Sequence, residues 1–172
     1  MYNGDWLEAT PLGRAEWIKF FGALYNKEKE ADSIFSSIEI QYNEAKKIAL
    51  QAKNSPEIMS GVLYKDKWNL PAGESFTAKL YEDANTSYIW KGSKGQGSLV
   101  LSFETVFEKA EKADYWIGSG YFTTLDELKA SNAHYEQFKS FKTGNVYSFS
   151  KRRSKYGGVE YFELGPLQPH IV

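Results

Sequence analysis

The feature that most constrains the fold is a long amphipathic helical pattern from about Lys27 to Lys53, ended by "NSP" (54–56). Its apolar face consists of Ala31, Ile34, Phe35, Ile38, Tyr42, Ala45 and Ile48, and charged runs such as "KEKE" and "NEAKK" occupy the other face. At ~1.5 Å per residue this helix would be about 40 Å long, which is long for a chain of this size. We therefore expect a strut that runs along one compact body or between two.

A shorter helical pattern, "TPLGRAEWIKFFGALYN" (10–26), precedes the strut. Thr10 is suited to cap the helix, and Pro11 occupies the first helical position, where a missing N–H costs no hydrogen bond. We therefore expect residues 1–26 to form an entry segment, residues 27–54 the long helix, and residues 55–172 a separate structural unit.

Strand and helix patterns alternate after Pro56. Strands are predicted at 57–64, 87–90, 115–120 and 145–150, and helices at 75–84, at 102–113 with Ser102 as cap, and in two short pieces within 124–141. This alternation is typical of βαβ units. We predict an α/β fold, a three-layer α/β/α sandwich with a small, mostly parallel sheet. Ligands bind such sheets outside the carboxyl ends of the strands, in loops here expected at 65–73, 91–98, 118–122 and 151–158.

Composition argues against several classes of function. The chain has no Cys, which excludes disulfides and thiolate chemistry, and its two His, His134 and His170, are too far apart in sequence to indicate a metal cluster. A net charge of −1 gives no indication of nucleic-acid binding, and no apolar run approaches the ~18 residues of a membrane span. Aromatic residues make up 16%, a surplus typical of ligand-binding surfaces and also of plain cores.

No catalytic motif emerges from the sequence. The segment "GSKGQGS" (92–98) has Ser98 where a phosphate loop needs Lys, so a flexible loop is favoured. There is no GxSxG motif. The carboxylates that could form an acid/base pair show no dyad spacing: Glu74, Glu104, Asp114, Glu160 and Glu163.

Two segments are open to a binding interpretation. The sequence "SKRRSKYGG" (150–158) is either a solvated loop or an anion clamp, since guanidinium groups pair bidentately with carboxylates. In "WNLPAGESF" (68–76), Trp68 either covers the core or presents a flat ring to a ligand. Its position after the first strand, just before a helix, favours the ligand-facing orientation.

Several stretches resemble one protein family. "LEATPLGRAEWIKFFGALYNKEKEA" (7–31), the series "WNLPAGESF", "YIW" and "LSFETVFEKAEKADYWI", and the "GGVEYFELGPLQP" segment (157–169) are similar to substrate-binding proteins of ABC importers for ferric siderophores, haem and vitamin B12. In that family one rigid helix joins two α/β lobes, and ligand binds between them. The resemblance implies that this chain is the carboxy-terminal half, lacking a first lobe, a signal sequence and a final helix.

The resemblance also implies roles for individual residues and an exported protein. Glu104 would dock onto permease arginines, although a Glu in a first helical turn is also favourable in itself. The ligand would be a metal chelate, with no cofactor or resident metal, and the full-length protein would lie in the periplasm or cell envelope, possibly lipid-anchored. The positions that would contact ligand are Trp68, Leu70, Gly73, Glu74, Ser75, Arg152 and Tyr161.

Two other classes stay open on sequence alone. An α/β enzyme related to nitrogenase-type or flavodoxin-like proteins would share the strand–helix alternation, but the chain lacks cluster-binding Cys and a phosphate fingerprint. A pure protein-interaction module would use Glu104 and the aromatic residues only to dock partners.

Overall fold

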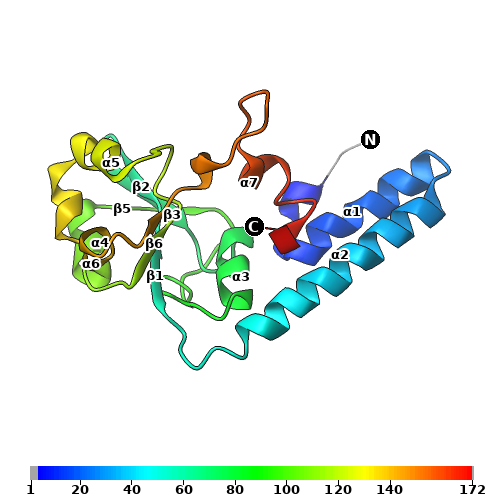
Figure 1. The fold of residues 1–172 in the computed structure, drawn as a ribbon, viewed down its shortest axis with the longest axis horizontal. Helices are drawn as coiled ribbons and strands as arrows, with labels where there is room; N and C mark the ends of the chain where they lie inside the picture. Colours follow the sequence, from blue (N-terminus) through cyan, green and yellow to red (C-terminus); the bar gives the residue numbers. More distant parts are fainter. Residues whose placement is uncertain (1–3, 172) are drawn as a thin grey trace.

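Two helices form a hairpin that projects from the α/β body in the computed structural model, which describes residues 4–171 (Figure 1). They are α1 (Pro11–Leu24) and α2 (Glu28–Ala49). Thr10 caps α1 by accepting a 3.1 Å hydrogen bond from the amide of Gly13. The 22 residues of α2 make it about 33 Å long. Both predicted helices are therefore present, and the longer one ends four residues earlier than expected.

A four-stranded sheet forms the centre of the body, with strand order β4-β1-β6-β7 and all neighbours parallel. The predicted parallel sheet is confirmed, although each strand is shorter than expected. The strands are β1 (Glu57–Ser60), β4 (Ser87–Tyr88), β6 (Tyr115–Ile117) and β7 (Val146–Tyr147).

Helices cover both sides of this sheet (Figure 1). One side, facing α1 and α2, carries α3 (Phe76–Asp83), and the other carries α4 (Phe103–Ala110) and α6 (Lys139–Lys142). The short helices α5 (Leu125–Ser131) and η2 (Ala133–Gln137) lie beyond α4 and α6. The predicted α/β class with a small parallel sheet is confirmed.

A second, antiparallel sheet was not anticipated. Its order is β2-β3-β5, from Val62–Tyr64, Lys67–Pro71 and Ser98–Leu101. Gly61, with φ of +83°, breaks the strand expected over 57–64, and Lys65, with φ of +57°, lies in the tight turn between β2 and β3. The predicted loops 65–73 and 91–98 are therefore partly strand. A lysine in the left-handed region gives no turn signal that sequence patterns recognise.

Trp68 lies in the core, so its predicted ligand-facing orientation is wrong. The side chain is 0% exposed, and its Nε1 donates a 2.9 Å hydrogen bond to the carbonyl of Ser60. Its ring centroid is 5.4 Å from that of Trp116 and 5.7 Å from that of Phe138. Because β3 belongs to the antiparallel sheet, Trp68 faces the interior between the sheets and not a loop edge. Trp90 and Trp116 are also buried and belong to the same core.

The C-terminal segment crosses from the sheet back to the helical hairpin (Figure 1). It contains η3 (Phe149–Lys151), α7 (Glu160–Glu163) and η4 (Pro169–Ile171), and η4 packs against α1 and α2. This segment therefore bridges the gap between the body and α2. Within residues 4–171, no helix is both long and apolar enough to cross a bilayer.

Candidate functional site

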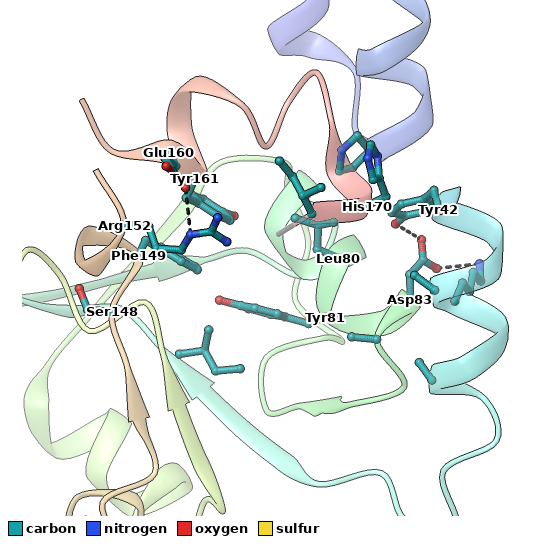
Figure 2. A pocket seen from close by; sticks show the side chains of 17 residues that line it. Tyr42, Leu80, Tyr81, Asp83, Ser148, Phe149, Arg152, Glu160, Tyr161 and His170 are labelled. Atoms are coloured by element: carbon teal, nitrogen blue, oxygen red, sulfur yellow. Dashed lines mark hydrogen bonds and ion pairs between the residues drawn. The ribbon is translucent and has the colours of Figure 1, made fainter. Parts of the chain in front are cut away.

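A hollow of about 460 Å³ lies between α2, α3 and the C-terminal segment (Figure 2). Ile117 at the carboxyl end of β6 and Ser148 just after β7 contribute to it. Its walls are mainly aliphatic and aromatic, with a few charged groups. The hollow has the size and the lining of a small-molecule site. It also lies at the carboxyl ends of parallel strands, where α/β proteins bind such ligands.

Arg152 and Glu160 form an ion pair at one side of this hollow (Figure 2). The Nε of Arg152 lies 2.9 Å from Oε2 of Glu160, and the side chains are 73% and 30% exposed. Because the guanidinium is largely in water, the pair contributes little to stability and can exchange partners. The structure thus places Arg152, one of the predicted site residues, at the hollow.

Tyr161, a second predicted residue, also lines the hollow. Its ring stacks on Phe149 with centroids 3.7 Å apart and an interplanar angle of 6°. Its hydroxyl shares a 3.1 Å hydrogen bond with Oγ1 of Thr77 on α3. Burial raises the pKa of the Tyr161 phenol, which therefore stays neutral at physiological pH. Two contacts thus fix the ring on one wall.

The opposite wall contains a buried carboxylate, Asp83, at the end of α3 (Figure 2). Tyr42 donates a 2.7 Å hydrogen bond to its Oδ2, and Nζ of Lys46 lies 2.7 Å from its Oδ1. Burial pushes the Asp83 pKa upward, but the hydrogen bonds from Lys46 and Tyr42 outweigh burial and hold the pKa below its ordinary value. Burial, and then the bond to Asp83, raises the pKa of Tyr42. The cluster fastens α2 to α3.

His170 of η4 adds a further polar group to this side of the hollow, close to Tyr42 in Figure 2. Its Nδ1 is buried, and no group within residues 4–171 hydrogen-bonds to it. A buried ring nitrogen without a protein partner is uncommon. Because this atom is covered by protein, His170 lines the hollow through other parts of its side chain or backbone. The same described residues contain no group of three His, Asp or Glu side chains that could hold a metal ion.

A smaller hollow of about 360 Å³ lies at the N-terminus of α3 and also has Tyr161 in its wall. Ser75 caps α3 by accepting a 3.2 Å hydrogen bond from the amide of Ala78, and it lines this second hollow together with Phe162 and Arg14. Ser75 and Tyr161 therefore line the same smaller hollow, and ligand contact by either stays a prediction.

Three other predicted residues lie outside both hollows. Leu70 is 2% exposed and belongs to the core, so its predicted role at a ligand cleft is wrong. The amide of Gly73 donates a 2.8 Å hydrogen bond to Oγ of Ser93, and Oε2 of Glu74 accepts a 2.9 Å bond from the amide of Gly95. Gly73 and Glu74 thus fasten the turn after β3 to the loop before β5, and ligand contact by either stays a prediction.

Glu104 is exposed in the first turn of α4, whose N-terminus Ser102 caps as predicted. Its own backbone amide, and then the Ser102 hydroxyl, lowers the pKa of the Glu104 carboxyl. The side chain is therefore an accessible anion at a helix start. Its predicted role in permease docking is not decided by this geometry and stays a prediction.

Sequence reasoning missed Phe149, Asp83, Lys46 and His170 as residues of the hollow. They come from four separate segments, so no local spacing connects them. A weak signal exists only for Phe149, which follows β7 at the edge where ligands were expected.

The fold and the position of the hollow are those of the class of α/β proteins that bind small molecules. Residues 5–152 match a family model described as periplasmic binding protein. Because this match covers most of the chain, the protein belongs to the periplasmic binding protein family. The predicted family is confirmed, and with it the prediction of a binding protein in place of an enzyme.

Two curated relatives come from Methanocaldococcus jannaschii, both described as uncharacterized lipoproteins. One is 34% identical over 173 residues, covering 99% of this chain and 39% of its own length. The other is 30% identical over 149 residues, covering 81% of this chain and 37% of its own length. The chain thus spans well under half the length of these relatives.

Solved structures share the fold at low sequence identity. A possible iron-binding, periplasmic solute-binding protein from Staphylococcus epidermidis has a TM-score of 0.70 and 14% identity, over 95% of this chain and 63% of that one. The periplasmic heme-binding protein HutB of Vibrio cholerae has a TM-score of 0.68 and 15% identity, over 94% and 62%. The heme complex of Staphylococcus aureus IsdE has a TM-score of 0.62 and 17% identity, over 81% and 55%. Similarity at this level shows a common fold only.

Proposed function

We propose that this protein is the solute-binding component of an ABC importer, which captures a metal complex of the iron-siderophore, haem or cobalamin type and delivers it to the permease. The observation that carries the proposal is the placement of Arg152 and Tyr161. The family resemblance singled out both, and both line one hollow at the carboxyl ends of the parallel strands. The names of the structural neighbours, which include iron-binding and heme-binding proteins, support the same ligand class.

The hollow offers two kinds of contact to such a ligand. Phe149 and Tyr161 supply aromatic surface for the organic part of a chelate. Arg152 would exchange Glu160 for an acidic group on the ligand, because its guanidinium is mostly solvated and already positioned at the hollow. Binding of this kind is non-covalent and requires no catalytic group.

The contribution of Arg152 is tested with a pair of charge-removing variants. Haem, cyanocobalamin and a ferric trihydroxamate would each be titrated into the wild-type protein, Arg152→Gln and Lys155→Gln, with intrinsic fluorescence as the signal. A charge-assisted hydrogen bond is worth about 1.5–3 kcal/mol, so we expect Arg152→Gln to weaken binding of an acidic complex about tenfold or more. Lys155 is exposed in the same basic loop and does not line the hollow, so its variant should bind as the wild type does. Equal affinities of the two variants for haem, the acidic complex of the three, would contradict the proposed site.

Delivery to the permease, in this proposal, uses Glu104. Its exposed carboxylate at the start of α4 suits an arginine on a partner surface. The lipoprotein descriptions of the relatives support an exported, envelope-associated protein. Glu104→Arg should abolish binding to the purified permease complex, whereas Glu108→Arg, at an exposed position of the same helix, should retain it. Loss of binding in both variants would indicate a general charge effect and would contradict a specific role for Glu104.

A further inference from the structure

Three aromatic rings separate the two hollows. Tyr161 lines both, Phe149 lines only the larger and Phe162 only the smaller. The ring of Tyr161 stacks face to face on Phe149 at 3.7 Å and meets Phe162 edge to face at 5.1 Å and 83°. We call Phe149, Tyr161 and Phe162 the aromatic wall.

The wall is held from both the sheet side and the helix side. Phe149 follows β7 in η3, while Tyr161 and Phe162 lie in α7. The hydroxyl of Tyr161 is bonded to Thr77 in the first turn of α3, which fixes the ring against rotation out of the wall. Two contacts on different elements therefore hold the middle ring, whereas Phe162 is 57% exposed and less constrained.

We propose that Tyr161 determines the size of ligand that the protein accepts, an inference that rests on the proposed function. With the wall in place, a ligand in the larger hollow of about 460 Å³ cannot extend past the Tyr161 ring. Removing the Tyr161 ring joins this hollow to the neighbouring one of about 360 Å³. The wall thus admits compact metal complexes and excludes longer ones by steric conflict. A rigid site can reject in this way a ligand that is chemically similar to the one it binds but larger.

The test uses two neutral ferric hydroxamates of different size: compact ferric tris(acetohydroxamate) and the much larger ferrichrome. Each is titrated into the wild-type protein, Tyr161→Ala, Tyr161→Phe and Tyr156→Ala. We expect the wild type to bind the compact chelate at least about tenfold more tightly than the large one, and Tyr161→Ala to lose most of that preference by gaining affinity for ferrichrome. Tyr161→Phe keeps the ring and should keep the preference for the compact chelate, whatever its absolute affinities.

Tyr156→Ala is the matched control, because Tyr156 is 86% exposed and lines neither hollow, so its preference should equal that of the wild type. If Tyr161→Ala does not fold, Phe162→Ala replaces it as the test variant. This substitution removes the aromatic ring on the side of the smaller hollow and should also reduce the preference for the compact chelate. A wild type without a size preference, or a folded Tyr161→Ala protein that keeps the wild-type preference, would overturn the inference alone. Failure of the wild type to bind either chelate would overturn the inference together with the ferric-siderophore part of the proposed ligand class, whereas haem or cobalamin binding would still support the proposed function.

Discussion

Tyr42 on α2 donates a 2.7 Å hydrogen bond to Asp83 at the end of α3, across 41 residues of sequence. With Lys46 on the other carboxylate oxygen, this bond attaches the long helix to the body and fixes one wall of the larger hollow. Lys79 lies 3.5 Å from the same carboxylate. One buried anion therefore helps to fix the position of α2.

Asp83→Asn should lower the free energy of unfolding by about 2 kcal/mol, because the substitution weakens two charge-assisted hydrogen bonds in a buried site. Urea denaturation followed by circular dichroism measures the change. The matched control is Glu82→Gln. The Glu82 carboxylate is 72% exposed and pairs with Lys79 at the surface, so its removal should change the unfolding free energy by less than about 0.5 kcal/mol. Equal effects of the two variants would contradict a special role for Asp83.

The same carboxylate predicts a pH dependence with a definite sign. The pKa of folded Asp83 lies below the ordinary value of 3.8, since hydrogen bonds from Lys46 and Tyr42 outweigh the opposing effect of burial. Its stabilisation is therefore fully present above the unfolded-state pKa and disappears as the pH falls through the lower folded-state pKa. The stability difference between wild type and Asp83→Asn should be largest near pH 7 and shrink below about pH 4. A difference that grows on acidification would contradict this assignment.

Trp68 provides a test of the core. Trp68→Ala should cost about 3–5 kcal/mol in unfolding free energy, the usual range for an aromatic ring removed from a close-packed interior. Trp6→Ala should cost much less, because Trp6 is 68% exposed. The difference in fluorescence between the wild type and Trp68→Phe is the contribution of Trp68, and we expect iodide to quench this contribution only weakly. Strong quenching of the Trp68 emission would show that this residue is exposed and would contradict its place in the core.

The sequence predicted the parallel sheet and the helix caps because those features are local. Thr10 and Ser102 each cap their helix with an acceptor three residues before the bonded amide. The short β-rich runs alternated with helical ones, which is enough to indicate βαβ units.

The antiparallel sheet and the site residues were harder to predict because they depend on tertiary contacts. The register that pairs Trp68 with Leu101 places the tryptophan in the core, and no pattern within "WNLPAGESF" reveals that pairing. Tyr42 and Asp83 come into contact only when α2 lies against the end of α3 in the folded protein. The basic run at 150–158 indicated a possible anion clamp by itself. Only the family resemblance singled out Tyr161 and, within that run, Arg152.

The turn after β3 has no room for a side chain at Gly73. A Cβ at this position would meet the carbonyl oxygens of Lys91 and Ser93, the latter at 2.6 Å. Gly73→Ala should therefore destabilise the protein by about 1–3 kcal/mol, as overpacking against backbone usually does. Gly92→Ala is the control in the adjoining loop, since a Cβ there has no atom within 4 Å. Thermal unfolding of both variants should separate them clearly, and coincident transitions would contradict the close approach at Gly73.

Isothermal titration of the wild-type protein is the most direct test of the proposed function. The panel comprises ferric tris(acetohydroxamate), ferrichrome, haem and cyanocobalamin, with a hexose and a free amino acid as controls. We expect at least one metal complex to bind with a stoichiometry of one and the two controls to show no binding. Tight binding of the hexose or the amino acid, with no heat from any metal complex, would contradict the account.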